Sequence, residues 1–441
     1  MSSESDNVKH ANSVYYTAIA DGTLVTRRTT KRHHTIDKVY NCSPEPSSRQ
    51  LEFKFDLGTE YVDGMESYLK FKLEYNTSGG FSEPTEPMPA KLSSGFTDLI
   101  QDIILIDRNG RELERIENVY QIASMLATST HTSDSLHNGS YVFPVDKRLP
   151  VSPATTTVLI PLHFLLGIFR TNTLVPPHIL DKATLRIRLR NANLVFSPTT
   201  TTVPVVLNEE GWIYSLTDPE IVFYSYNLDH RLHDLITEEY NSTGLHFPFE
   251  SHTHIGYDIP NDEFIDTLQI TQSFSRATKV LMAIDARIDD VPHLDAYFNN
   301  MLPAAGTERL HGPWIYSSLQ CKINDVTWPD TPVSEYIEAY QLWLSAFRAH
   351  RGVGISAQAK VDFLDGQRVC IDLDRGTVGN KSGQIISNKF PVAINMKLLE
   401  ANVHQSIHPD AFSRVLNRRL HAFVEHQRIL LAKSNNHIVI V

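Results

Sequence analysis

Residues 103–126 read IILIDRNGRELERIENVYQIASML, and residues 319–347 read LQCKINDVTWPDTPVSEYIEAYQLWLSAF. Each stretch runs from an apolar strand pattern through a turn into an apolar face with helical spacing. The Tyr-Gln pairs begin at Tyr120 and Tyr340, so they are separated by almost half of the 441 residues. A weak repeat at half the chain length is expected when two domains of one fold are joined in tandem. The sequence therefore predicts two similar domains, each with one strand–turn–helix unit.

One flanking helix is expected in each half, because apolar residues there recur at helical spacing. In the first half the apolar face consists of Ile116, Val119, Tyr120, Ala123 and Leu126. In the second half it consists of Val333, Tyr336, Ile337, Tyr340, Leu344 and Phe347. Thr331 is expected to cap the second helix, and Pro332 to occupy its first position.

The rest of the chain has the alternating pattern of half-buried strands. Apolar residues alternate with charged ones over residues 51–57 and 69–75, and Asp63-Gly64 between them predicts a turn. In the second half the expected strands are 266–272, 278–285, 319–324, 359–364, 368–374, 391–398 and 437–441. Many short strands joined by long loops favour a jelly roll over an immunoglobulin-like domain.

The fold class expected is therefore all-β, with two tandem antiparallel eight-stranded jelly-roll sandwiches and a short flanking helix in each. Residues 1–45 are polar and are expected to form an N-terminal arm. Residues 46–207 are expected to form the first jelly roll and residues 208–441 the second. The Ser/Pro/Thr-rich stretch of residues 197–204 indicates the linker or a loop close to it.

Composition limits the classes of function. The net charge of −11 argues against a body that binds nucleic acid, because phosphate contacts need clustered Lys and Arg. Cys42, Cys321 and Cys370 are too few and too far apart for a disulfide framework or a zinc motif, which indicates assembly in a reducing compartment. The start MSSESD lacks the features of a signal peptide, and the apolar stretch 158–169 is shorter than a membrane span.

The expected arm holds the dense basic cluster of the sequence: Arg27, Arg28, Lys31, Arg32, His33, His34 and Lys38. A mobile cationic arm on an acidic body could contact packaged nucleic acid or an acidic neighbouring protein. The alternative is a solvated terminus with incidental charge. The sequence leaves both interpretations open.

Candidate catalytic and metal-binding patterns are weak. Residues 376–382 read GTVGNKS, which lacks the glycine spacing of a phosphate-binding loop. His252 and His254 share a strand face, but no motif supplies a third metal ligand, and His421 and His426 have unsuitable spacing. These histidines could instead titrate and loosen an interface in acid.

The spacing of Asp372 and Asp374 fits a general acid–base pair, but it fits the wet face of a strand more simply. The sequence therefore predicts a protein that is not an enzyme and that needs no cofactor or metal.

Three segments resemble the double jelly-roll major capsid proteins of Polinton-like elements, adintoviruses and virophages, a lineage that includes adenovirus hexons and the coat proteins of tailless membrane-containing phages. They are IPLHFLLGIF at residues 160–169, LDKATLRIRL at residues 180–189, and the strand–turn–helix at residues 103–126 with its echo at residues 319–347. With the repeat, the resemblance covers most of residues 50–441.

The resemblance implies a structural major capsid protein that forms a homotrimer with a pseudo-hexagonal outline. Such capsomers tile an icosahedral virion shell, contact one another, and meet penton and minor capsid proteins, after assembly in the host cytoplasm or nucleus. It also implies that the arm, with Arg27, Arg28, Lys31, Arg32, His33 and His34, lies on the inner face against neighbours or packaged nucleic acid. No transmembrane segment is expected.

The sequence also allows other interpretations. Residues 164–166 and 168–169 could form an apolar interface patch or could fill the core of a sandwich. The whole chain could be a two-domain β-sandwich that binds carbohydrate, or a hydrolase on the same scaffold. It could also be a capsid protein of another lineage, with one shell domain and one protruding domain, although the repeat argues against unlike domains.

Overall fold

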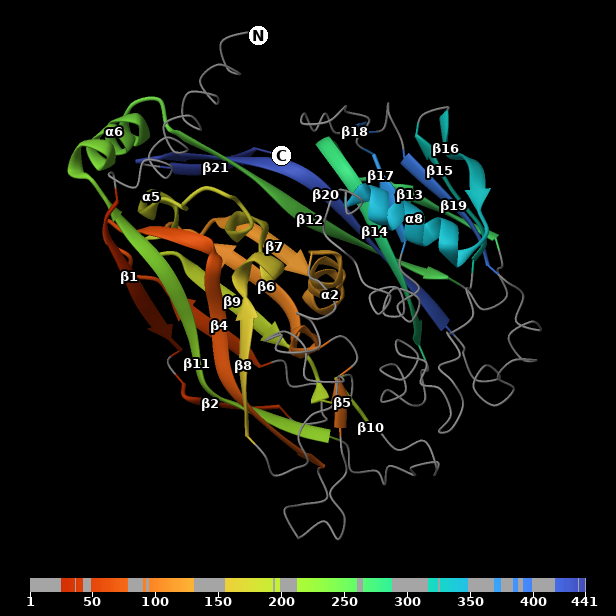
Figure 1. The fold of residues 1–441 in the computed structure, drawn as a ribbon, viewed down its shortest axis with the longest axis horizontal. Coiled ribbons are helices and arrows are strands. Elements are labelled where there is room, and N and C mark those ends of the chain that lie inside the picture. The colour runs from red at the N-terminus through yellow and green to blue at the C-terminus, as the bar shows by residue number, and fades with distance from the viewer. Residues whose placement is uncertain are drawn as a thin grey trace.

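The computed structural model describes most of the chain. The described ranges are 25–35, 37–42, 49–77, 90–92, 95–130, 155–192, 195–198, 212–259, 265–287, 316–323, 326–347, 369–373, 384–387, 392–398, 417–434 and 436–440. They form two antiparallel β-sandwiches side by side, as Figure 1 shows. The expected all-β double jelly roll is confirmed. The predicted strand at residues 359–364 lies outside the described residues.

The first jelly roll consists of a five-stranded and a four-stranded sheet. The larger sheet has the order β1 (Val25–His34), β11 (Trp212–Leu228), β4 (Tyr61–Thr77) and β8 (Thr156–Pro161), and β2 (Val39–Cys42) also pairs with β11. The smaller sheet has the order β3 (Gln50–Lys54), β9 (Thr184–Leu189), β6 (Ile100–Ile106) and β7 (Glu112–Glu117). A two-stranded ladder joins β5 (Ala90–Leu92) and β10 (Phe196–Pro198).

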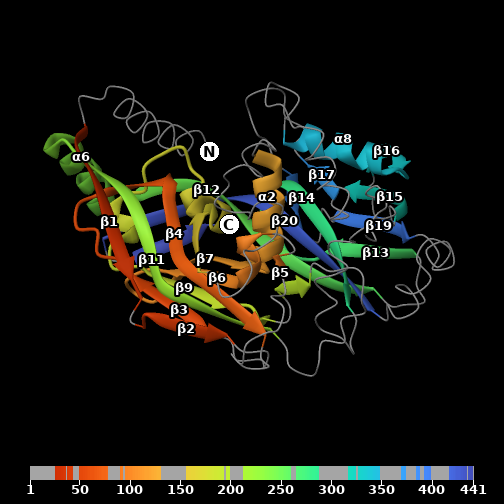
Figure 2. The same ribbon diagram turned by 60° about the horizontal axis from the view of Figure 1, so that its bottom comes forward.

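The second jelly roll consists of a six-stranded and a four-stranded sheet. The larger sheet has the order β12 (Leu245–Ile259), β20 (Asn417–Lys433), β14 (Phe274–Arg287) and β17 (Val369–Asp372). To this sheet β18 (Gln384–Ile386) adds on β14, and β21 (Asn436–Ile440) adds on β20. The other sheet has the order β13 (Ile265–Ile270), β19 (Val392–Leu398), β15 (Tyr316–Ile323) and β16 (Val326–Val333). Figure 2 shows the four-stranded sheet on the side of the molecule away from β1, whereas β12 of the larger sheet extends back toward the first jelly roll.

The strand pairing corrects the expected domain boundaries. β11 was expected in the second jelly roll, but it pairs with β1, β2 and β4 of the first. The boundary therefore falls in the connection between Leu228 and Leu245, where α6 (His230–Asn241) lies. Residues 25–34 and 39–42 were assigned to the arm, and they are strands of the first jelly roll because β11 supplies their hydrogen-bond partners.

The repeat unit holds in both halves, with local corrections. α2 (Val119–Thr130) contains Val119 and Tyr120, and α8 (Tyr336–Ala346) contains Ile337, Tyr340 and Leu344. Ile116, expected on the first helix, lies in β7, and Asn118 with φ 53° separates that strand from the helix.

The start of the second helix also differs from the prediction. Thr331 and Pro332 lie in β16, and α8 begins after Glu335 instead. The Glu335 and Glu338 side chains form a capping box that satisfies the free backbone N–H groups of this first turn. The predicted turn at Asp63-Gly64 is likewise absent, since both residues lie inside the long strand β4.

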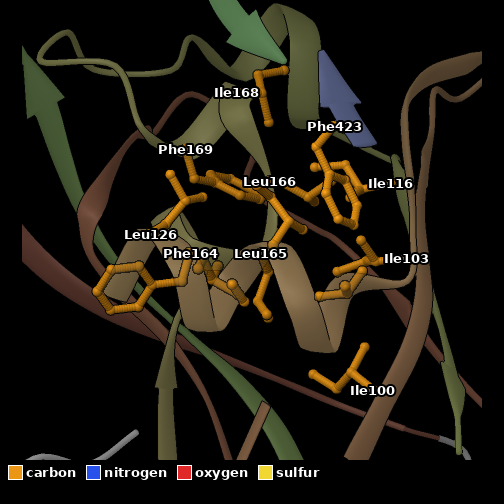
Figure 3. Close-up of a cluster of buried hydrophobic side chains, with 14 of the residues drawn as sticks. Ile100, Ile103, Ile116, Leu126, Phe164, Leu165, Leu166, Ile168, Phe169 and Phe423 are labelled. Atoms are coloured by element: carbon orange, nitrogen blue, oxygen red, sulfur yellow. The ribbon is translucent and has the colours of Figure 1, made fainter. Parts of the chain in front are cut away.

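The segment after β8 fills the core between strands and helix. It forms α4 (Leu162–Leu165) and η3 (Gly167–Phe169), and its apolar side chains are at most 1% exposed. Figure 3 shows Phe164, Leu166 and Phe169 among side chains of α2, β6 and β7, together with Phe423 of the second jelly roll. Of the two readings of this segment, core filling is the one the structure bears out.

Candidate functional site

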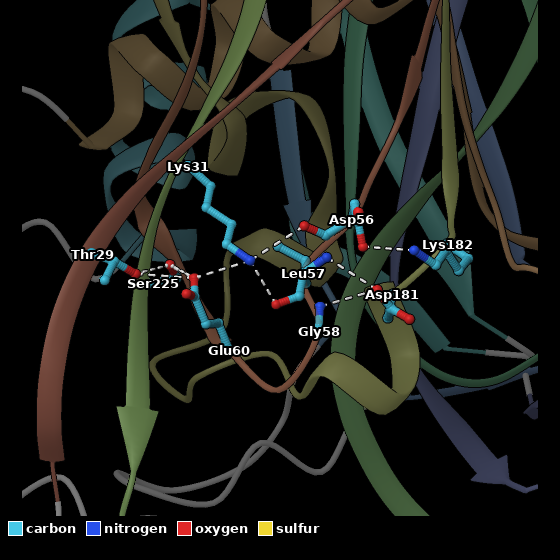
Figure 4. A network of polar contacts seen from close by, with 9 residues as sticks. All are labelled: Thr29, Lys31, Asp56, Leu57, Gly58, Glu60, Asp181, Lys182 and Ser225. Carbon is cyan, nitrogen blue, oxygen red and sulfur yellow. Dashed lines mark hydrogen bonds and ion pairs between the residues drawn. The ribbon is translucent and has the colours of Figure 1, made fainter.

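The basic residues at positions 27–34 lie in the edge strand β1, and carboxylates lie beside Arg28, Lys31 and Arg32. The Lys31 ammonium group donates to the Leu57 carbonyl oxygen at 2.8 Å and lies 3.6 Å from a Glu60 carboxylate oxygen (Figure 4). Because Thr29 and Ser225 bind the same Glu60 carboxylate, β1 and β11 are joined to the loop after β3 by a polar network. Lys31 is therefore a structural residue of the first jelly roll.

The neighbouring arginines lie on the opposite, outer face of the same strand. Arg28 forms an ion pair with Glu66, and its guanidinium group lies 5.0 Å from the centre of the Tyr224 ring. Arg32 lies 3.4 Å from the buried carboxylate of Glu220. Both side chains remain more than half exposed, so this face can still meet another protein even though its charges are largely balanced within the chain.

Two histidines of the basic segment differ sharply in their surroundings. His33 points into the sandwich and contacts the rings of Phe55 and Phe223 at 5.4 and 5.3 Å. Burial lowers the pKa of His33, with Lys31 acting in the same direction, so the imidazole is neutral at pH 7. His34 is 63% exposed and lies 3.9 Å from Glu220. The expected free cationic arm is therefore wrong for residues 25–34, which are fixed in a sheet.

A second site of dense polar chemistry lies where the two jelly rolls meet. β12 contacts β7 and η3 of the first jelly roll, and Figure 1 shows β12 and β20 running across from the second jelly roll toward α6. At Gly167 a β-carbon would lie 1.7 Å from the Glu250 carbonyl oxygen, so the backbones of η3 and β12 touch directly. Only glycine fits this contact.

Glu114 of β7 forms the centre of this contact. Its carboxylate is fully buried and accepts hydrogen bonds from Gly167 N at 2.9 Å, Ile168 N at 3.0 Å and the Ser251 hydroxyl at 2.6 Å. Burial raises the pKa of Glu114, while these three donors act in the opposite direction. The carboxylate thus links β7, η3 and β12 through bonds that require its oxygens as acceptors.

Next to it, Glu425 of β20 gathers a second group of buried polar side chains. The Glu425 carboxylate accepts from Lys279 and from the Thr278 hydroxyl, and lies 3.4 Å from His252 Nε2. Lys279 and His252 hold the pKa of Glu425 well below its usual value against the effect of burial. Arg170, which follows η3, reaches across from the first jelly roll to 3.4 Å from His252 Nδ1. We call Glu114, Arg170, Ser251, His252, Thr278, Lys279, Glu425 and His426 the inter-domain polar cluster.

The candidate metal ligands bind one another or other protein groups. His254 Nε2 lies 2.9 Å from His421 Nδ1, and Asn118 lies 3.2 Å from the His254 ring. His252 and His426 belong to the inter-domain polar cluster. Within the ranges that the structure describes, no group of three or more His, Cys, Asp or Glu side chains is arranged to hold a metal ion.

The structure describes only part of the remaining catalytic candidates. Asp372 lies in β17, whereas Asp374 and the loop 376–382 lie outside the described residues. All three cysteines are buried, and burial raises the pKa of the Cys321 thiol to about 12. A thiol that stays protonated is a poor nucleophile. In the described part of the chain, no helix is long and apolar enough to cross a membrane.

Comparison with solved structures identifies the fold as that of the double jelly-roll major capsid proteins. PBCV-1 VP54 aligns with a TM-score of 0.60 and 10% identity over 94% of this chain and 97% of that chain. The Sputnik virophage structure aligns with a TM-score of 0.58 and 11% identity, covering 95% and 89% of the two chains. The Faustovirus major capsid protein aligns with a TM-score of 0.56 and 8% identity, covering 93% and 91%. At these identities the likeness establishes the fold.

Sequence comparison adds no relative. No protein-family model matches the chain, and no curated protein matches it.

Proposed function

We propose that this protein is a structural major capsid protein, a subunit of a viral shell and not an enzyme. The observation that carries the proposal is the tandem pair of jelly rolls, which aligns with nearly the full length of capsid proteins such as that of Faustovirus. The absence of shared sequence is consistent with this role, because a shell subunit needs shape and interfaces more than fixed catalytic residues.

The duplicated fold supports a trimeric capsomer. Three chains with two similar sandwiches each give six lobes around a threefold axis, which suits a position with nearly sixfold surroundings in an icosahedral lattice. Such capsomers would contact one another, and penton and minor capsid proteins would complete the shell. The protein would then reside in the virion, after assembly in the host cytoplasm or nucleus.

Exposed apolar side chains supply candidate contacts between copies. Val39, Met65, Leu235, Trp328, Ile337 and Ile385 are the large apolar residues with the greatest exposure in the described regions. Permanent interfaces bury more than ~2,000 Å² and are rich in apolar and aromatic groups. Contact of residues 27–34 with packaged nucleic acid is not part of the proposal, because these residues form a strand in which Arg28, Lys31 and Arg32 have acidic partners.

Mass photometry of the full chain tests the proposal. The expected result is a species near 150 kDa, three copies of the 49.9 kDa chain, or larger closed particles. Three single variants each change an exposed apolar side chain: Leu235→Asp, Trp328→Ala and Ile385→Asp. At least one of them should shift the mass of the species toward that of the monomer while its circular dichroism spectrum is unchanged. A strict monomer at micromolar concentration that binds glycans would contradict the proposal and favour the carbohydrate-binding alternative.

A further inference from the structure

Two histidines of the inter-domain polar cluster are deeply buried beside cations. The His252 side chain is 0% exposed, with Arg170 on its Nδ1 side and Glu425 on its Nε2 side. His426, across from Ser251 in the β12–β20 pairing, is 2% exposed. Its Nε2 pairs with the Thr253 hydroxyl at 3.0 Å, and its Nδ1 has no hydrogen-bond partner among the described residues.

The charged groups around these rings come from both jelly rolls. His252 faces Arg170 of the first jelly roll and Lys279 and Glu425 of its own sheet.

The charged groups near His426 are His252, Glu425 and Arg428. Arg428 in turn faces Glu112 and Glu114 of β7. Glu250 acts on Arg170 and Lys279 from β12. With Arg170, Lys279 and Arg428 already cationic, a proton on either imidazole adds positive charge at a buried ring.

We propose that the inter-domain polar cluster makes the junction between the jelly rolls sensitive to acid: protonation of His252 and His426 separates β12 and β20 from η3 and β7. The reason is geometric. His252 lies where the two jelly rolls touch, 3.4 Å from Arg170 of the first. His426 lies on the neighbouring strand β20, opposite Ser251, whose hydroxyl binds Glu114 of the first jelly roll. β12 and η3 meet in a direct backbone contact at Gly167. A charged imidazole can regain water only if this contact opens. The proposal concerns a single chain and does not depend on shell assembly.

The pKa shifts of the two histidines determine whether acid favours the opened or the closed junction, and over which pH range. Burial lowers the pKa of His426 to about 3 and also lowers that of His252 below its usual 6.5. An opened junction returns both to about 6.5, so the opened form binds more protons and gains population as pH falls below that value. Between pH 6.5 and 5.5 each histidine contributes up to about fivefold, or about thirtyfold together.

The carboxylates modify this response in predictable ways. Burial raises the pKa of Glu114, so the closed form takes up a proton there at higher pH than the opened form does. That uptake offsets up to tenfold per pH unit of the histidine effect. The pKa of Glu425 is lowered in the closed form, so its contribution is lost only below about 4.5. The net expectation is a rise in opening of about threefold to thirtyfold between pH 6.5 and 5.5.

Hydrogen–deuterium exchange of the full chain at pH 7.5, 6.5 and 5.5, corrected for intrinsic exchange rates, tests the proposal. Peptides covering residues 112–117, 167–169 and 245–259 should exchange about threefold to thirtyfold faster at pH 5.5 than at pH 6.5. Peptides covering β15 and β19 should not. Residues 25–34 are scored separately, because His33 is also buried as a neutral imidazole.

Variants separate these histidines from the others. His252→Gln/His426→Gln should lose the pH response, whereas His230→Gln, at a side chain that is 78% exposed, should keep it. If the double variant does not fold, the wild-type profile alone decides. Junction exchange that does not change with pH, or that changes equally in all protected peptides, overturns the proposal, as does a folded double variant that responds like the wild type.

Discussion

The hydroxyl group of Ser251 donates a 2.6 Å hydrogen bond to the carboxylate of Glu114, and this bond joins a strand of the second jelly roll to a strand of the first. Both groups are buried, so neither can exchange its partner for water without opening the contact. The two sandwiches therefore share a polar contact that fixes how one sits against the other.

Replacing Glu114 by Gln should destabilise this contact. An amide group of the same shape would present N–H donors to Gly167 N, Ile168 N or Ser251, which are donors themselves. We expect a loss of about 1–3 kcal/mol in the free energy of unfolding, measured by urea denaturation. The matched control is Glu112→Gln on the same strand, where an exposed ion pair with Arg115 is removed at a cost below ~1 kcal/mol. Equal midpoints for the two variants would contradict the assigned role of Glu114.

Replacing Gly167 by Ala should push β12 away from η3. The added carbon would lie 1.7 Å from the Glu250 carbonyl oxygen, and backbone atoms cannot yield as a flexible side chain does. We expect a loss of roughly 3 kcal/mol or more, seen as a lower thermal midpoint.

Gly58→Ala provides the comparison for Gly167→Ala, because Gly58 has φ +64° but no atom within 4 Å of an added carbon. That variant should cost only the ~1 kcal/mol of a left-handed backbone. If the two alanine variants melt together, the close approach of η3 and β12 is not what requires glycine at position 167.

Deleting residues 1–45 should impair folding of the first jelly roll itself. The deletion removes β1 and β2, uncovers β11 along most of one edge, and removes the buried His33, Tyr40 and Cys42. We expect loss of soluble protein or a large fall in the thermal midpoint, followed by circular dichroism. Arg28→Ala, which removes an exposed ion pair and leaves the strand in place, should change the free energy of unfolding by less than ~1 kcal/mol. A deletion variant as stable as the full chain would mean that β1 adds nothing to the sandwich.

The thiols of Cys42, Cys321 and Cys370 should not react with a water-soluble disulfide reagent in the folded protein at pH 8. All three are buried, and burial raises the pKa of each, to about 12 for Cys321. Colorimetric titration should therefore detect three thiols only after denaturant is added. Detection of a thiol before denaturation would place that cysteine at the surface.

The sequence best predicts the elements that have one buried and one solvent-exposed face. In β3 and β9 the side chains alternate between core and solvent, so the period of two is visible in the letters. In the repeat unit the same holds for α8, which buries Ala339, Tyr340 and Trp343 on one face. It does not hold for α2, whose described side chains are all buried.

The elements that the sequence hides are of two kinds. β20 is buried on both faces from Leu420 to His426, so it mixes apolar residues with histidine and glutamate and has no alternation. β1 is polar on both faces, because Lys31 finds carbonyl and carboxylate partners on the inner side while Arg28 meets solvent on the outer. In β11 the Asp218-Pro219 pair reads as a turn, and in the structure it is a bulge inside a long strand.

The polar cluster between the domains could not be predicted either. Glu114, Arg170 and His252 lie far apart in sequence, and no motif connects them. Only the approach of β12 to η3, which depends on the whole fold, makes these residues neighbours.

The pairing of the first strand with β11 has a consequence for how the protein is made. Thr29 hydrogen-bonds to Ser225, a partner 196 residues later in the chain. At a translation rate of about 5–20 residues per second, the nascent N-terminal segment emerges from the ribosome roughly 10 to 40 seconds before the strand it needs. Charged side chains such as those of Arg28, Lys31 and Arg32 disfavour pairing of this segment with other exposed strand edges during that wait.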